Sequence, residues 1–335
     1  MDYRPLGRTG VKVSSLCLGC MNFGGKTNME DSSEIMDHAI DSGINFFDTA
    51  NVYSRGESEK TVGAALKANG KRDKIVLATK VHGKMDDDDV NAQGNNRRHI
   101  IQQCEASLKR LKTDWIDLYQ IHRPDSTIPI DETLRALDDL IRAGKVRYVG
   151  TSTFAAWQMV KAHWIAKELG LNRFICEQPP YNLLDRRIER ELIPMAISFG
   201  MAIIPWSPLA SGFLTGKYKR NEDRPEGSRL KTNKFHEDCF EDRCFDVVEE
   251  VEKMAKEKGC TPSQLSLAWC VGQPGVTSPI IGPRTMEQLK DNLGALDVEL
   301  DSEYLARLDK ISEPGHGSAR FYEADFGPEK FVGLL

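Results

Sequence analysis

The chain has 335 residues, of which 40% are apolar and 28% charged, and its formal net charge is −5. This length and apolar fraction suffice for one large core, so we expect a single domain over residues 1–335. The acidic balance argues against a nucleic-acid surface, and no apolar run reaches the roughly 18 residues of a membrane span. The N-terminus lacks the apolar segment of a signal peptide, and eight scattered cysteines suit a reducing compartment, so a cytoplasmic location is expected.

Short apolar runs alternate with amphipathic helical patterns along most of the chain. Residues 1–14 precede the first run and are expected to form a small hairpin over the floor of the fold. The candidate strands are residues 15–18, 45–48, 75–80, 116–122, 146–150, 174–178, 201–205 and 278–282. Eight strands alternating with helices predict an α/β fold, a single (β/α)8 TIM barrel with long loops at its C-terminal face. An open doubly wound sheet is the competing architecture, although no Gly-x-Gly-x-x-Gly motif follows an early strand.

Two helix starts can be predicted from capping signals. Asp31, with Glu34 three residues later, is typical of the start of a helix. Thr261 is followed by Pro262 and Gln264, which combines an N-cap, a first-turn proline and a capping box. A helix is therefore expected to begin at each of these positions.

Several segments lie outside the alternation of strands and helices. Residues 217–244 are rich in charged side chains and predict a long mobile loop or a locally helical segment. Cys239 and Cys244 are expected to lie in a polar loop there, as ordinary small core residues. The acidic run 86–89 predicts a solvated loop rather than a cation site. Cys17 and Cys20 have the spacing of a redox or zinc pair, but no second pair completes a tetrahedral site. We expect them to be small buried residues, and we expect no metal centre.

Polar residues of complementary chemistry stand at the ends of three predicted strands. Asp48, Lys80 and His122 end the second, third and fourth strands, and Tyr53 lies in the loop after Asp48. The C-terminal strand ends of a barrel meet at one face, where the chemistry of such enzymes gathers. Taken singly, each side chain has an ordinary structural role available, as a turn cap, a rim lysine or a packed ring. A phenol is a poor acid at its reference pKa of about 10, and only a nearby cation and a prepared site make it a useful proton donor.

The order of these motifs resembles the aldo-keto reductase superfamily over nearly the whole chain, from residue 3 to about residue 296. The motifs that carry the resemblance are Phe47-Asp48-Thr49-Ala50 through Tyr53, the strand ending in Lys80, Leu118-Tyr119-Gln120-Ile121-His122, Gly150-Thr151-Ser152, Trp206-Ser207-Pro208-Leu209 and Gly282-Pro283-Arg284. The closer likeness is to the branch that contains bacterial general-stress reductases and potassium-channel β subunits.

The resemblance implies reduction of an aldehyde or ketone to the alcohol by hydride transfer from NADPH, with NADH the less favoured cofactor. Tyr53 would act as the general acid on the carbonyl oxygen. Lys80, held by Asp48, would make this phenol a better acid, and His122 would orient the carbonyl. The substrate pocket would be lined by Met21, Phe23, Tyr53 and His122.

The resemblance also assigns the cofactor contacts. Ser152 and Gln178 match residues that hydrogen-bond the nicotinamide carboxamide, and Trp206 matches the aromatic residue that stacks on the ring. Arg284 matches the position that meets the 2′-phosphate, because a planar guanidinium suits phosphate. The remaining contacts would come from Gly19, Asp48, Ser207, Pro208, Leu209, Ser211, Gly212, Lys217, Gly282, Gln288, Asp291 and Asn292.

Three hypotheses for function follow from these patterns. The first is the NADPH-dependent carbonyl reductase, a monomer or homo-oligomer whose partner is a small-molecule carbonyl substrate rather than nucleic acid or membrane. The second is an NADP(H)-binding redox-sensing subunit with slow turnover, and the third is a barrel lyase or isomerase without nicotinamide. Residues 300–335 are expected to form a C-terminal helix and a tail that closes over the substrate or packs between subunits. The aromatic residues of this tail are Phe321, Tyr322, Phe326 and Phe331.

Overall fold

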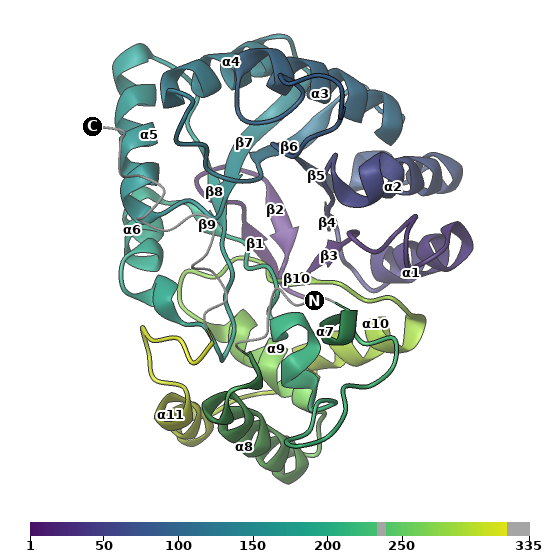
Figure 1. The fold of residues 1–335 in the computed structure, drawn as a ribbon, viewed down its shortest axis with the longest axis vertical. Coiled ribbons are helices and arrows are strands. Elements are labelled where there is room, and N and C mark those ends of the chain that lie inside the picture. The colour runs from purple at the N-terminus through teal and green to yellow at the C-terminus, as the bar shows by residue number, and fades with distance from the viewer. Residues whose placement is uncertain (233–238, 320–335) are drawn as a thin grey trace.

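Eight parallel strands curl into a barrel in the computed structural model, which describes residues 1–232 and 239–319. Their order in the sheet is β10-β3-β4-β5-β6-β7-β8-β9 (Figure 1). Two backbone hydrogen bonds join the outer strands: Thr277 donates to the carbonyl of Ile203 and Ile280 to that of Pro205, both at 2.8 Å. The sheet is therefore closed, as the barrel prediction requires, and not an open doubly wound sheet.

Each barrel strand overlaps the apolar run that predicted it. The strands are β3 (Cys17–Gly19), β4 (Phe46–Asp48), β5 (Val76–Val81), β6 (Ile116–Ile121), β7 (Val146–Ser152), β8 (Cys176–Gln178), β9 (Ala202–Ile203) and β10 (Ile280–Ile281). Nearly all of their residues are buried, because one face of the sheet fills the barrel and the other packs against helices. That double burial explains why these runs are continuously apolar.

Helices surround the barrel (Figure 1). They are α1 (Met29–Asp41), α2 (Glu57–Asn69), α3 (Arg97–Leu111), α4 (Ile130–Arg142), α5 (Ala156–Leu169), α6 (Leu192–Phe199), α8 (Asp242–Lys258), α9 (Pro262–Gly272), α10 (Met286–Leu293) and α11 (Ser302–Ile311), with the short α7 (Arg229–Thr232) at one end. The predicted cap of α9 is confirmed, since Thr261 Oγ1 accepts a hydrogen bond from the Gln264 amide at 3.1 Å. The start predicted at Asp31 is wrong. Asn28 caps α1 by accepting from the Asp31 amide at 2.9 Å, so Asp31 lies in the first turn, where a carboxylate is also favourable.

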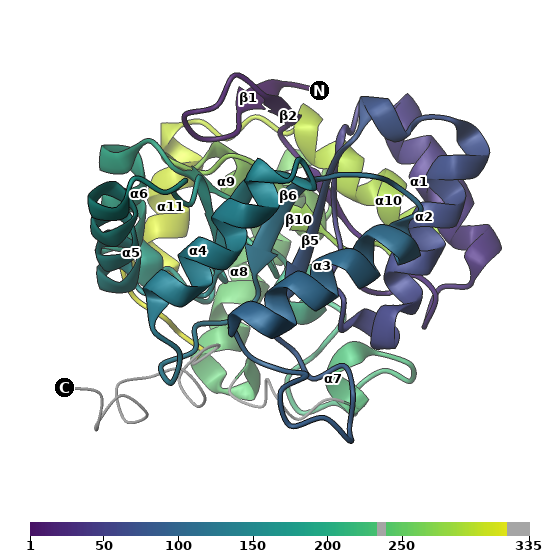
Figure 2. The same cartoon turned by 90° about the horizontal axis from the view of Figure 1, so that it is seen from above.

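The first 14 residues cover the N-terminal end of the barrel. Strands β1 (Tyr3–Pro5) and β2 (Lys12–Ser14) pair antiparallel, and Figure 2 shows them at the end of the molecule opposite α7. Leu6 and Val13 are fully buried in a cluster with inward-pointing strand residues such as Phe46 and Leu118. Burying a leucine or valine contributes about 1.5–3 kcal/mol, so the hairpin seals the barrel floor by apolar contact.

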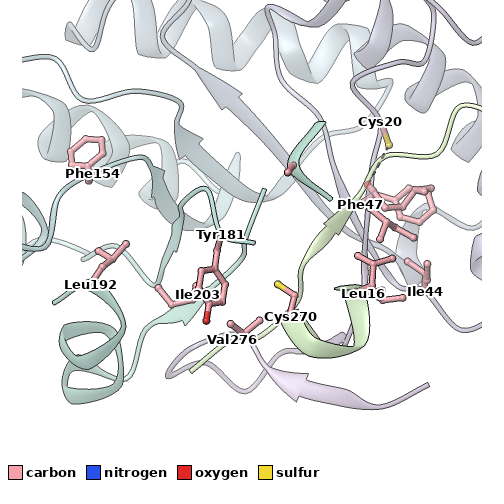
Figure 3. Packing of buried hydrophobic residues seen from close by; sticks show 14 of the residues in the cluster. Leu16, Cys20, Ile44, Phe47, Phe154, Tyr181, Leu192, Ile203, Cys270 and Val276 are labelled. Carbon is pink, nitrogen blue, oxygen red and sulfur yellow. Dashed lines mark hydrogen bonds between the residues drawn. The ribbon is translucent and has the colours of Figure 1, made fainter. Parts of the chain in front are cut away.

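A larger core lies between the barrel and its helices. Figure 3 shows part of it, with Leu16, Ile44 and Phe47 in one group and Tyr181 near Ile203 and Val276 in another. Cys17 and Cys20 are both fully buried and carry free thiols, so they are core residues, as predicted.

The charged segment 217–244 is locally helical in part. Helix α7 lies within it, and α8 begins at Asp242, so Cys244 is a buried helical residue and not a loop residue as expected. The C-terminal helix is α11, whereas the tail residues Phe321, Tyr322, Phe326 and Phe331 lie outside the described residues. In residues 1–232 and 239–319, no helix has both the length and the apolarity to cross a bilayer.

Two buried histidines on the outer helices make the stability of the fold depend on pH. Burial lowers the pKa of His99 on α3 and of His163 on α5 from 6.5 to about 4. Below pH 6.5 the unfolded chain therefore takes up protons at these residues that the folded protein does not, and stability falls as the pH falls toward 4.

We expect the free energy of unfolding to fall by about 2 kcal/mol per histidine between pH 7 and pH 5. Urea unfolding at the two pH values measures it, and the variant His163→Phe should be less acid-sensitive than the wild type. Equal pH dependence in both proteins would contradict the assignment.

Candidate active site

A cavity of about 520 Å³ opens where the barrel strands end. Gly19, Asp48, Ser152 and Gln178 end strands β3, β4, β7 and β8, and all four line it. The cavity also brings together the other expected site residues, which come from loops and from α10: Met21, Tyr53, His122, Trp206, Ser207, Pro208, Leu209, Ser211, Gly212, Lys217, Gly282, Arg284, Gln288, Asp291 and Asn292. Lys80 lies behind the wall, bonded to two of the lining residues.

The Lys80 ammonium has three acceptors, one for each of its N–H groups. Nζ donates to Asp48 Oδ2 at 2.5 Å, to the Thr49 carbonyl at 2.9 Å and to the Tyr53 hydroxyl at 3.2 Å. The side chain is fully buried. Burial by itself lowers the pKa of Lys80, but the charges and hydrogen bonds of Asp48 and Tyr53 outweigh it and hold that pKa above its ordinary value. Lys80 therefore keeps its positive charge beside the Tyr53 phenol near neutral pH.

Tyr53 reaches this lysine from the loop after β4. It begins the 3-10 turn η1 (Tyr53–Gly56), in which Ser54 and Arg55 have positive φ angles of 48° and 53°. Such a conformation costs about 1–3 kcal/mol per residue and is characteristic of functional loops. The ring is half-buried. One side faces Lys80, and the other side faces the cavity.

His122 stands against Tyr53 on the cavity wall. The two ring centroids are 5.5 Å apart, and the ring planes meet at 85°. Burial, followed by the charges of Lys80 and Arg123, lowers the pKa of His122 well below its usual value. The imidazole is therefore neutral near pH 7 and can donate one hydrogen bond into the cavity without carrying a charge.

Gln120 joins Asp48 to the other side of the barrel, a role that no sequence pattern indicated. Its Nε2 donates to Asp48 Oδ1 at 3.1 Å, and Gln178 Nε2 donates to the same oxygen at 3.0 Å and to Gln120 Oε1 at 3.2 Å. Lys80 and Gln120 are also direct neighbours in the β5–β6 register. The Asp48 carboxylate thus holds Lys80 with one oxygen and two amides with the other.

This network predicts a stability effect. Gln120→Leu keeps the side-chain volume but leaves buried polar atoms of Asp48 and Gln178 with fewer partners, so unfolding free energy should fall by about 1–3 kcal/mol. Urea titration measures the difference. Gln102→Leu, on the exposed face of α3, is the matched control and should change stability by less than about 0.5 kcal/mol. Equal stabilities for the two variants would show that the network contributes nothing.

The strand end carrying Ser152 is fixed by a buried carboxyl group. Glu177 accepts hydrogen bonds from the Thr151 hydroxyl and, at 3.0 Å, from the Phe154 amide. Burial raises the pKa of Glu177 to about 8, despite these donors. Because Thr151 and Phe154 flank Ser152, Glu177 sets the path of the loop that presents Ser152 to the cavity.

Trp206 begins the loop that forms the opposite wall. After it, Ser207, Ala210 and Ser211 have positive φ angles of 56°, 49° and 57°, leading into the 3-10 segment η4 (Ala210–Thr215). Ser207 Oγ accepts from the Ser211 amide at 3.0 Å, which holds this tight turn. Small side chains here leave the backbone open to close approach by a ligand.

Several cationic side chains line the cavity. Lys217 and Arg284 were expected among the lining residues, and the structure adds Lys26, Arg123 and Arg229. Burial and the charge of Arg284 lower the pKa of Lys217. Arg123 could have been predicted as a lining residue because it directly follows His122. Arg229 comes from α7, and no sequence signal indicated that it lines the cavity.

One expected pocket residue is wrong. Phe23 is fully buried in the core and does not line the cavity, whereas its neighbours Met21 and Asn22 do. The Phe23 amide donates to the Cys20 carbonyl at 3.0 Å, and this turn directs the ring between strand and helix instead of into the cavity.

The chain belongs to the aldo/keto reductase family, whose model matches residues 15–313. It is 41% identical over 334 residues to the uncharacterized oxidoreductase YrpG of Bacillus subtilis, covering 95% of this chain and 97% of that protein. A putative voltage-gated potassium channel subunit beta of Schizosaccharomyces pombe is 39% identical over 323 residues, covering 93% of each. The versiconal hemiacetal acetate reductase of Aspergillus parasiticus is 34% identical over 343 residues, covering 94% of this chain and 98% of that protein. The family resemblance inferred from the sequence is confirmed, and the chain is a member of an oxidoreductase family.

Proposed function

We propose that this protein is an NADPH-dependent reductase of aldehydes or ketones that works in the cytoplasm. The observation that carries the proposal is the buried Lys80 ammonium, bonded at once to the Asp48 carboxylate and the Tyr53 phenol at the wall of a large cavity. A phenol needs a fixed cation beside it to act as an acid near neutral pH. The relatedness to a named reductase supports the same chemistry.

The residues of the cavity fit a phosphorylated dinucleotide. Trp206 offers an aromatic face, and Ser152 with Gln178 offers a hydroxyl and an amide for a carboxamide. Lys217, Arg229 and Arg284 line the same cavity. Burial, together with the charge of Arg284, lowers the pKa values of Lys217 and Arg229, so a bound polyanion would relieve this repulsion. When bound, NADPH would supply the hydride.

The chain's own residues would supply the proton and the orientation. Tyr53 would donate its hydroxyl proton to the carbonyl oxygen of the substrate, and Lys80 would stabilise the phenolate that remains. The neutral His122 would donate a hydrogen bond to the same oxygen, which fixes the carbonyl for attack from one side. Asp48 would hold Lys80 in place through Oδ2, while its Oδ1 accepts hydrogen bonds from Gln120 and Gln178.

A redox-sensing subunit is the second candidate, favoured by the similarity to proteins named as potassium channel β subunits. It would bind NADPH at the same site but oxidise it slowly, and it would form a stable complex with a partner protein. No observation favours the third hypothesis, a lyase or isomerase without nicotinamide. That function would leave the cationic side chains of the cavity without an anionic ligand.

A panel of aldehydes, ketones and sugars, assayed with NADPH and with NADH, tests the proposal. Absorbance at 340 nm should fall only when both NADPH and a carbonyl substrate are present, at a turnover within the usual enzyme range of about 1–1000 per second for the best substrate. Tight NADPH binding with turnover far below this range for every substrate would favour the sensor. Absence of NADPH binding would contradict both candidates.

A further inference from the structure

A second cavity, of about 510 Å³, lies at the floor of the barrel. Its walls come from the turn between β1 and β2, the end of α4 and the starts of β7 and β8. Figure 2 shows β1 and β2 at the end of the molecule opposite α7, and the candidate active site opens at the other ends of the strands. Three arginines line it together with an apolar wall: Arg8, Arg147 and Arg173, with Ile141, Tyr148 and Ile175. The volume is that of a small-molecule pocket.

The positive charge of this cavity is not neutralised by the protein. None of its lining residues is Asp or Glu, and within residues 1–232 and 239–319 no carboxylate forms an ion pair with any of the three arginines. Asp138 bonds to Asn172 at the cavity edge at 2.8 Å but forms its ion pair with Arg142. A cluster of three cations therefore persists on a protein whose net charge is −5.

Structural contacts account for few of the guanidinium N–H groups. Arg173 Nη2 donates to the Phe199 carbonyl at 3.2 Å and Arg147 Nη1 to the Gly144 carbonyl at 2.9 Å, both at helix C-terminal ends that favour cations. Each guanidinium has five N–H donors, so these bonds use a minority of them. Arg8 lies across Gly200, where an added Cβ would come within 2.4 Å of Arg8 Cγ.

Two of the arginines, Arg8 and Arg173, are also close enough to repel each other. Burial and the charge of Arg8 lower the pKa of the Arg173 guanidinium. Holding like charges together costs free energy, which a bound anion would recover. A phosphate monoester carries a charge of about −1.5 to −2 at pH 7, and its oxygens match the planar fork of arginine.

We propose that the floor cavity binds a small phosphorylated metabolite. Its phosphate would lie among Arg8, Arg147 and Arg173, and its organic part would lie against Ile141, Tyr148 and Ile175. Phosphate is favoured over a single carboxylate because three cations call for more than one negative charge. This site is separate from the candidate active site and does not depend on the reductase proposal.

Isothermal titration calorimetry at low salt tests the proposal with phenyl phosphate as the probe. The double variant Arg8→Gln/Arg173→Gln should bind at least tenfold more weakly than wild type. Arg135→Gln removes one exposed charge from α4 outside the cavity and should change the Kd by less than twofold. Arg8→Gln alone, in an exposed side chain with no hydrogen bond to the fold among the described residues, should weaken binding without affecting the circular dichroism spectrum.

The cations of the candidate active site also attract phosphate, so the titration is repeated on Arg284→Ala. Binding to the floor cavity should persist there with the wild-type Kd. Loss of binding in Arg284→Ala, or unchanged binding in the double variant, would overturn the proposal. Benzoate titrated in parallel should bind at least tenfold more weakly than phenyl phosphate, and equal affinity would overturn the assignment to phosphate.

Discussion

Replacing Tyr53 by phenylalanine should abolish aldehyde-dependent oxidation of NADPH while NADPH still binds. The change removes one hydroxyl group, and a positioned general acid contributes about 10²- to 10⁴-fold to the rate. Lys80 keeps Asp48 and the Thr49 carbonyl as acceptors for two of its three N–H groups, so the charge remains paired and the barrel should fold. Steady-state kinetics give the loss in kcat, and quenching of tryptophan fluorescence gives the NADPH affinity.

Tyr304→Phe is the matched control for this prediction. Tyr304 lies on α11 and its ring faces Lys258, so the same hydroxyl deletion is made far from the cavity lining. It should leave kcat within about twofold. Turnover of a good aldehyde by Tyr53→Phe at the wild-type rate would remove Tyr53 from the role of acid and leave the proton to another group.

Replacing Arg284 by alanine should weaken NADPH binding by about 10- to 150-fold and NADH binding by less than threefold. A hydrogen bond to a charged group contributes about 1.5–3 kcal/mol, and the two cofactors differ only in the 2′-phosphate. Fluorescence titration with each cofactor measures both values. Arg135→Ala, exposed on α4, is the control and should bind both cofactors as wild type does.

Arg284 also makes structural contacts, which give a second reason why its replacement could weaken cofactor binding. Its Nη1 donates to the Gly227 carbonyl at 3.2 Å, and its backbone amide donates to Gln288 Oε1 at 2.9 Å. The first bond ties Gly227, in the segment just before Arg229 and α7, to the cavity rim. If NADPH and NADH lost affinity equally, this tie, and not a 2′-phosphate contact, would explain the effect of the substitution.

The barrel and the grouping of polar side chains at the candidate site could be predicted from the sequence because both follow from local patterns. Continuous apolar runs indicate strands buried on both faces, and their alternation with helices implies parallel order. Parallel order in turn places every strand end at one face, so Asp48, Lys80 and His122 could be assigned to one site before any contact was known. Tyr53 followed from its place in the adjoining loop.

Features that depend on contacts across the fold could not be predicted in this way. Phe23 and Met21 stand two residues apart in one loop, and only the turn at Cys20 decides that one ring enters the core and the other side chain enters the cavity. Asn28 replaced the expected Asp31 as a helix cap because several nearby polar residues satisfied the same local pattern.

The sequence by itself determined the class of fold, the family and the set of polar groups that meet at the candidate site, because strand period and motif order are properties of neighbouring residues. Tertiary structure alone decided that Gln120 shares Asp48 with Gln178, that Arg229 joins the cations at the cavity rim, and that three arginines from separate turns and strands meet at the floor. Those contacts depend on strand register and loop path, which set distances between residues far apart in the chain.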